Sequence, residues 1–189
     1  MIRIGILGDI GSGKSYVANN FGYSVFNADH EVSKLYKKNK KVFYKLNKIL
    51  PKYITSFPIN KNEVTNAILS NKNNLKKIIK IVHKEIKVKM QSFIKKNKNK
   101  KIVVLDIPLL LENKINNKKD ILVFVEAKKH DIEIALKKRI NFNRKLYNKF
   151  KKIQFSPVYK KRKSNFIVKN DFTKKTVTKS IKNILNEIL

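Results

Sequence analysis

Residues 8–15 read G-D-I-G-S-G-K-S and match the phosphate-binding P-loop pattern G-x-x-x-x-G-K-[ST] at every fixed position. A short apolar run at residues 2–7 precedes the motif and predicts a buried strand. Apolar side chains at helical spacing follow it over residues 17–21. Strand, loop and helix in this order are the context that the motif requires, so the stretch predicts a nucleotide-binding α/β domain.

The residue types in this loop suit phosphate binding. Backbone N–H groups of the loop and the positive end of the following helix surround phosphate oxygens. Gly11 and Gly13 let the backbone approach a ligand without a Cβ atom in the way. Lys14 can reach the β- and γ-phosphates, and the Ser15 hydroxyl can ligate Mg²⁺. A glycine turn without a ligand is the alternative, and the complete pattern disfavours it.

Further strands and helices alternate along the chain. Apolar runs predict four more strands, at residues 24–26, 102–105, 121–125 and 165–168. Because helical patterns separate most of them, we expect a three-layer α/β fold with a five-stranded parallel sheet. We expect one domain with a core, a helical substrate-binding insertion and a lid; the core is 1–40, 100–140 and 156–189, the insertion about 41–99 and the lid about 141–155.

Two acidic residues lie where predicted strands end, which is where open α/β sheets hold their ligands. Asp29 follows the second strand and can act on a substrate hydroxyl, although it could also cap the next helix. Asp106 closes the third strand and can orient Mg²⁺ through its waters, with a turn or capping role as the alternative. His83 lies near the apolar stripe of a long predicted helix, where a packed or surface histidine is equally expected.

The formal net charge of +32 would usually suggest a nucleic-acid partner. Of the 45 basic residues only four are arginines, however, and the lysines are scattered among many Asn and Ile residues. Because these are residues of A/T-rich codons, codon drift explains the charge better than a specific nucleic-acid site, and no zinc or aromatic RNA-binding motif is present. A general attraction to polyanions follows either way.

Composition also bears on location. The chain has no cysteine, which fits a reducing compartment. It has no apolar run long enough to span a membrane. We also expect no signal peptide, because the first strand begins at Ile2 and runs into the P-loop. The expected location is the cytoplasm, with no membrane partner, and the sequence does not fix the oligomeric state.

The chain resembles the dephospho-CoA kinase family, which catalyses the last step of coenzyme A synthesis. The matching stretches keep the family's order from one end to the other: Ile4–Ser15, Phe26–Asp29, Ile81–His83, Val103–Glu112, Arg139, Gln154, Lys161–Arg162 and Ile167–Asn170. The segments N-A-D and L-D-I-P-L-L-L-E discriminate far better than the P-loop alone.

The resemblance implies a nucleoside-monophosphate-kinase-like fold that transfers the ATP γ-phosphate to the ribose 3′-hydroxyl of dephospho-CoA. It implies ATP contacts from eight residues: Gly11, Ser12, Gly13, Lys14, Ser15, Tyr16, Arg139 and Arg162. It also implies catalysis by Lys14, Asp29 and Arg139, and acceptor binding by Asp29, His83 and Asp106. Mg²⁺ would be held by Ser15, with Asp106 acting through water.

The rare arginines support part of this assignment. Arg139 is expected at the end of a helix entering the lid, and Arg162 just past the lid. Arginine can have been retained at these two positions because a planar guanidinium binds two phosphate oxygens at once. The alternative is that the four arginines remain by chance after codon drift toward lysine. Arg3 is expected to be exposed and to have no such role.

Several positions depart from the family pattern. Asp9 replaces a usual second glycine and is expected to point to solvent; Tyr16 replaces a common threonine, and Lys84 and Ile140 also differ. The nearest competing functions are those of a nucleoside-monophosphate or shikimate kinase, against which the D-I-P-L-L-L segment argues. A nucleic-acid-binding protein is the competitor from another class.

Overall fold

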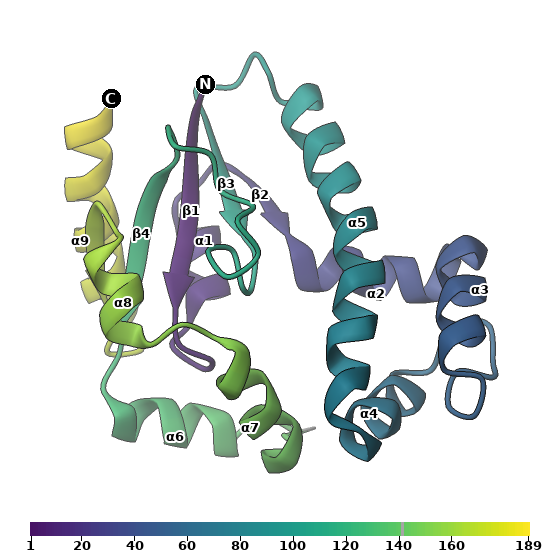
Figure 1. Ribbon diagram of the computed structural model, residues 1–189. Helices are drawn as coiled ribbons and strands as arrows, with labels where there is room; N and C mark the ends of the chain where they lie inside the picture. Colours follow the sequence, from purple (N-terminus) through teal and green to yellow (C-terminus); the bar gives the residue numbers. More distant parts are fainter. Residues whose placement is uncertain (141) are drawn as a thin grey trace. The chain divides into compact units, whose positions relative to one another are not determined.

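The computed structural model describes residues 1–140 and 142–189, which divide into two compact units (Figure 1). The first unit comprises Met1–Asn27 and Lys96–Leu189, and the second comprises Ala28–Lys95. Position 141, where the predicted lid begins, lies outside the described residues.

Within the described residues, the first unit contains one parallel sheet of five strands in the spatial order β2-β3-β1-β4-β5. The strands are β1 (Ile2–Gly8), β2 (Ser24–Asn27), β3 (Ile102–Asp106), β4 (Ile121–Glu126) and β5 (Phe166–Lys169). All five expected strands are confirmed within one or two residues. The central strand β1 ends at the P-loop, at the point where the strand order reverses and open α/β sheets bind ligands.

The helices of the first unit are α1 (Lys14–Asn20), α6 (Lys129–Lys137), α7 (Arg144–Ile153), α8 (Pro157–Arg162) and α9 (Lys174–Ile188). Helices α1 and α9 pack together on one face of the sheet, and α6 and α7 lie beyond the carboxyl ends of its strands (Figure 1). Val17 of α1 and Ile181 of α9 pack with Ile4 of β1 in one buried cluster. On the other side of the sheet from α1, α8 lies against β1 (Figure 1). The expected three layers are therefore present.

The second unit is helical. It contains α2 (Ala28–Lys38), α3 (Lys40–Ile49), α4 (Lys61–Ser70) and most of α5 (Lys72–Lys96). The apolar stripe of α5 is buried, as its helical spacing predicts: Leu75, Ile78, Val82, Ile86 and Met90. An ion pair of 3.0 Å between Lys45 and Glu85 links α3 to α5. Among the described residues, no helix is both long and apolar enough to cross a membrane.

Three sequence-based expectations are wrong in detail. The helix at whose end Arg139 is expected stops at Lys137, and Ile140 is 99% exposed. The short helix α8 is not among the expected elements, although Ser156 caps it and Pro157 is its first residue. Arg3 is not an exposed residue: its guanidinium lies 2.9 Å from the Asp120 carboxylate, whose side chain is 1% exposed.

Candidate active site

The P-loop connects β1 to α1 in the conformation that its glycines allow. Gly11 and Gly13 have φ angles of 89° and 87°, in the left-handed region that glycine adopts without strain. A Cβ atom at Gly11 would lie 2.9 Å from Leu136 of α6, and one at Gly13 would collide with the Asn170 amide. Both glycines are therefore needed for backbone shape and for close packing around the loop.

The ammonium group of Lys14 lies over its own loop. It donates a hydrogen bond of 2.7 Å to the backbone carbonyl oxygen of Asp9, and lies 3.5 Å from that of Gly8. The positive charge is thus held against carbonyl oxygens at the start of the P-loop. Phosphate binding by Lys14 stays a prediction.

Asp106 lies at the end of β3, buried and bonded to neighbours on both sides. The Asn27 amide at the end of β2 donates a hydrogen bond of 2.8 Å to the Asp106 carboxylate. The register of the two strands pairs these same residues. Burial raises the pKa of the Asp106 carboxyl, while a hydrogen bond with Ser15, the charge of Lys14 and the Asn27 bond oppose the rise.

The structure therefore brings Ser15, Lys14 and Asp106 together at the carboxyl ends of β1 and β3. Hydroxyl and carboxylate oxygens are the donors that Mg²⁺ prefers, and this cation usually keeps several waters and binds substrate phosphates as well. Among residues 1–140 and 142–189 there is no group of three or more His, Cys, Asp or Glu side chains that could hold a metal ion. The Ser15 hydroxyl and the Asp106 carboxylate are donors of the kind that such a cation accepts beside phosphate oxygens.

Asn170 is a site residue that sequence reasoning matched to the family but did not assign. Its side chain is buried, and its amide donates a hydrogen bond of 2.8 Å to the Ser12 carbonyl oxygen. Its own carbonyl oxygen accepts a bond of 2.9 Å from the backbone N–H of Phe172. Asn170 thus fixes the P-loop to the segment between β5 and α9. The only signal in the sequence was its position in the matching stretch Ile167–Asn170.

Both arginines expected at the nucleotide are exposed. Arg139 lies two residues beyond the end of α6, not within the helix as expected, and its backbone N–H donates to Leu136. Arg162 is the last residue of α8, and its guanidinium lies 5.9 Å from the centroid of the Tyr159 ring.

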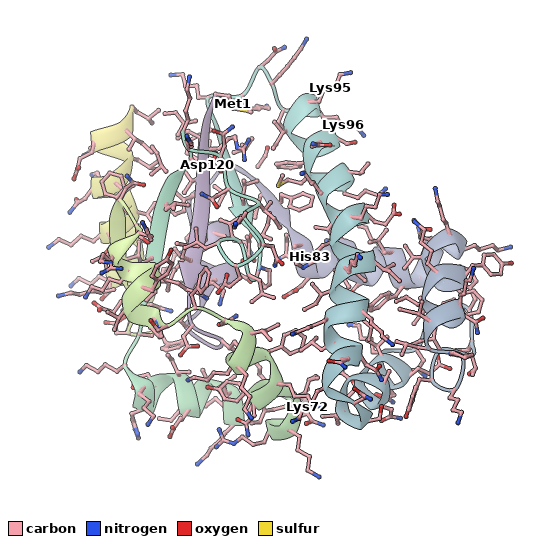
Figure 2. All side chains as sticks on the ribbon, viewed as in Figure 1. Met1, Lys72, His83, Lys95, Lys96 and Asp120 are labelled. Atoms are coloured by element: carbon pink, nitrogen blue, oxygen red, sulfur yellow. The ribbon has the colours of Figure 1, made fainter. Side chains whose placement is uncertain are left out.

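Two further predicted residues belong to the second unit. Asp29 is the second residue of α2 and lies in its first turn, directly after the end of β2. A carboxylate in this turn is favoured by the helix dipole. His83 lies on α5 (Figure 2), where it is half-buried beside the buried Val82.

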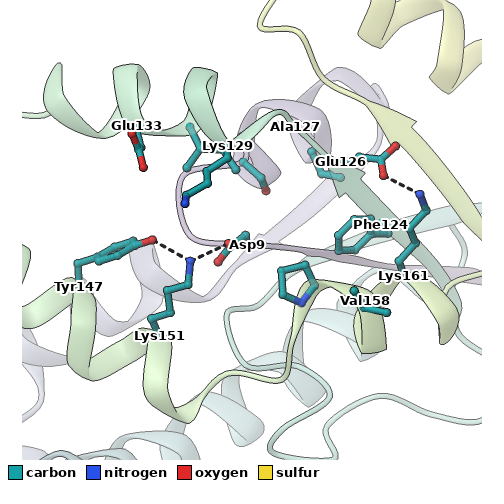
Figure 3. Close-up of a pocket in the computed structure, with 14 residues that line it drawn as sticks. Asp9, Phe124, Glu126, Ala127, Lys129, Glu133, Tyr147, Lys151, Val158 and Lys161 are labelled. Carbon is teal, nitrogen blue, oxygen red and sulfur yellow. Dashed lines mark hydrogen bonds and ion pairs between the residues drawn. The ribbon is translucent and has the colours of Figure 1, made fainter.

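A cavity of about 470 Å³ opens beside the P-loop, between the end of β4 and helices α6, α7 and α8 (Figure 3). Its apolar lining includes Phe124, Val125, Ile132, Pro157 and Val158. Two ion pairs border it: Lys151 with Asp9 at 3.3 Å, and Lys161 with Glu126 at 2.6 Å. The expectation that Asp9 points to solvent is wrong, since its carboxylate is paired and 17% exposed.

Comparison with known proteins gives one consistent result. A family model described as dephospho-CoA kinase matches residues 2–176. The dephospho-CoA kinase of Wolbachia pipientis wMel is 33% identical over 190 residues, covering 98% of this chain and 97% of the relative. That of Bartonella henselae is 33% identical and covers 87% of each chain.

Solved structures agree in fold. The crystal structure of TT1252 from Thermus thermophilus superposes with a TM-score of 0.77 at 23% identity, covering 100% of this chain and 98% of the other. The dephospho-CoA kinase from Campylobacter jejuni gives a TM-score of 0.63 at 20% identity, covering 98% and 96%. A shikimate kinase from Bacteroides thetaiotaomicron gives 0.56 at 11% identity, covering 99% and 98%.

Proposed function

The chain belongs to the dephospho-CoA kinase family and catalyses the ATP-dependent phosphorylation of dephospho-CoA to coenzyme A, and we propose here how its residues divide that work. The main support for this function is the match of the dephospho-CoA kinase family model over residues 2–176. The P-loop of the matched chain directly follows the central strand of a parallel sheet. The phosphoryl group goes to the ribose 3′-hydroxyl of the acceptor.

On this proposal, the residues from Gly11 to Tyr16 bind the ATP phosphates, chiefly through backbone N–H groups and the Lys14 ammonium. Lys14 stabilises the charge that develops on the transferred group. The bond from Lys14 to the Asp9 carbonyl supports this role, because it holds the cation at the loop before a ligand arrives. Arg139 and Arg162 add guanidinium groups that can bind phosphate oxygens in pairs.

Mg²⁺ is the proposed metal partner of ATP, held by the Ser15 hydroxyl and, through water, by Asp106. When bound, it neutralises phosphate charge and orients the γ-phosphate. The support is the donor set itself: the two oxygen-bearing side chains are hydrogen-bonded to each other beside the charge of Lys14. Asn27 fixes the Asp106 carboxylate from the neighbouring strand.

Asp29 is proposed to accept the proton of the ribose hydroxyl or to orient that hydroxyl for attack. It follows the end of β2 in the chain, next to Asn27, whose amide is bonded to Asp106. His83 and the helices of residues 41–99 are proposed to bind the acceptor, with residues 141–155 as the lid.

Cytoplasmic location is proposed because the chain contains no cysteine and needs no disulfide.

The function is tested by measuring ATP consumption with several hydroxyl acceptors under identical conditions. Dephospho-CoA is expected to support turnover, with coenzyme A identified by mass spectrometry, while shikimate and nucleoside monophosphates give only background rates. Preferred turnover of shikimate or a nucleoside monophosphate would overturn the assignment. Loss of activity on chelation of Mg²⁺, restored by adding Mg²⁺, is the expected result for the proposed metal.

A further inference from the structure

Asp9 places a negative charge on a loop that must bind phosphates. It is the second residue of the P-loop motif, directly after the end of β1. One carboxylate oxygen accepts a hydrogen bond of 2.8 Å from the backbone N–H of Ile10, so the side chain is fixed against its own loop. The backbone carbonyl of the same residue holds Lys14 at 2.7 Å. Unneutralised, this carboxylate would repel the triphosphate that the loop binds.

The other carboxylate oxygen is bound by a lysine from a distant helix. Lys151 of α7 places its ammonium 3.3 Å from Asp9 and 3.1 Å from the Tyr147 hydroxyl (Figure 3). The ammonium also lies 5.5 Å from the centroid of the Tyr147 ring. Lys151 is thus held by two partners: Asp9 of the P-loop, and Tyr147, which lies one turn earlier on α7. The hydrogen bond with Tyr147 and the charge of Asp9 raise the pKa of Lys151.

We propose that Lys151 is a positioning residue for ATP binding, which acts by neutralising and restraining the Asp9 carboxylate on the P-loop. The inference rests on the proposed function only in that ATP is the ligand of this loop. The proposed role belongs to Lys151 and not to every lysine of α7. The next residue, Lys152, is also exposed, but its side chain leaves the helix in a different direction. The effect of removing Lys151 should therefore depend on the charge at position 9.

The experiment is a double-mutant cycle read by calorimetric titration with Mg-ATP, without any acceptor. The variants are Lys151→Met, which keeps most of the aliphatic stem beside Tyr147, and Asp9→Asn, which keeps an oxygen for the Ile10 N–H group. Lys151→Met alone should weaken ATP binding at least fivefold. Asp9→Asn combined with Lys151→Met should return the dissociation constant to within about twofold of Asp9→Asn alone.

Lys179→Met is the control, because it removes one exposed lysine of α9 outside the proposed lid, and it should stay within about twofold of the unchanged protein at the same ionic strength. Thermal melting of every variant identifies any that is misfolded. If the double variant binds ATP as weakly as Lys151→Met, Lys151 acts on the nucleotide directly and the proposal is overturned. Unchanged binding by a folded Lys151→Met variant overturns it too. Because no acceptor is present, failure here is distinct from failure of the dephospho-CoA assignment.

Discussion

The buried amide of Asn170 donates a hydrogen bond of 2.8 Å to the backbone carbonyl of Ser12, joining positions 158 residues apart in the chain. This bond fixes the peptide between Ser12 and Gly13, which is part of the P-loop. A peptide held in this way presents its N–H group in one direction, so less ordering is required when phosphate binds. Asn170 is therefore expected to position the loop without contributing to the chemical step.

Asn170→Ala should raise the KM for ATP by about tenfold, with a smaller change in kcat, because binding is affected more than transfer. It should also lower the free energy of unfolding by about 1–3 kcal/mol, since the Ser12 carbonyl loses its buried partner. Initial rates at varied ATP and urea unfolding give the two numbers. A stability loss with an unchanged KM would show that Asn170 is only a packing residue.

Lys14→Ala should lower kcat by about 10²–10³, by analogy with loss of one preorganised electrostatic group. Stability should change little, because the Lys14 hydrogen bonds to the Asp9 and Gly8 carbonyl oxygens lie within its own, partly exposed loop. Rates at saturating ATP and dephospho-CoA, with a melting curve for each protein, make the comparison. Near-normal turnover would contradict the phosphate-binding role of this loop.

The sequence predicted the sheet well because its strands carry unambiguous signals. Ile102–Asp106 is a continuous apolar run ending in a carboxylate, and it is buried along its whole length. The end of α6 was predicted less well, because periodicity shows which face can be buried but not whether a partner exists. Ile140 continues the period and is nevertheless exposed.

The candidate site divides in the same way. Motif spacing is local, so the P-loop residues and Asp106 could be named from the sequence. Asn170 and Lys151 make contacts with residues 158 and 142 positions away, which no local pattern encodes. Lys151 is also one of very many lysines, and only the fold distinguishes it from its neighbours.

Asp29→Asn should lower kcat by about 10²–10⁴ while ATP affinity stays within a few-fold, because the residue is proposed to act on the acceptor hydroxyl. The helical environment should tolerate the change, since Asn and Asp are similar in size. Steady-state kinetics with dephospho-CoA, together with ATP titration, separate the two effects. Full activity of Asp29→Asn would leave Asp29 with only a structural role at the start of α2.

Tyr36 predicts a stability change at high pH. Burial raises the pKa of the Tyr36 phenol to about 12 in the folded protein, from 10.0. The folded state therefore holds the phenol proton more tightly than the unfolded state does. The contribution of Tyr36 to the free energy of unfolding is complete below pH 10 and is lost as pH rises toward about 12. Tyr36→Phe has no phenol to ionise, so it should not show this loss. Between about pH 8 and about pH 11.5, the free energy of unfolding of the unchanged protein, measured with urea, should fall by on the order of 2 kcal/mol more than that of the variant. An equal loss of stability in both proteins would contradict the burial effect on Tyr36.

Arg139→Lys tests whether a planar guanidinium is required at the nucleotide. Arg139 is exposed beyond the end of α6, where charge alone would be served as well by lysine, the basic residue this chain uses almost everywhere. If the Arg139 guanidinium binds two phosphate oxygens, the substitution should lower kcat/KM at least tenfold, equivalent to about 1.4 kcal/mol of transition-state stabilisation.

Arg144→Lys is the matched control, because Arg144 is also exposed and contacts the rings of Phe142 and Tyr147. Arg3 cannot serve as that control, since it is paired with the buried Asp120. All rates should be measured at one ionic strength, because the net charge of +32 makes every phosphate contact sensitive to salt. Equal kcat/KM for Arg139→Lys and Arg144→Lys would show that the charge suffices and that the rarity of arginine in this chain carries no functional information.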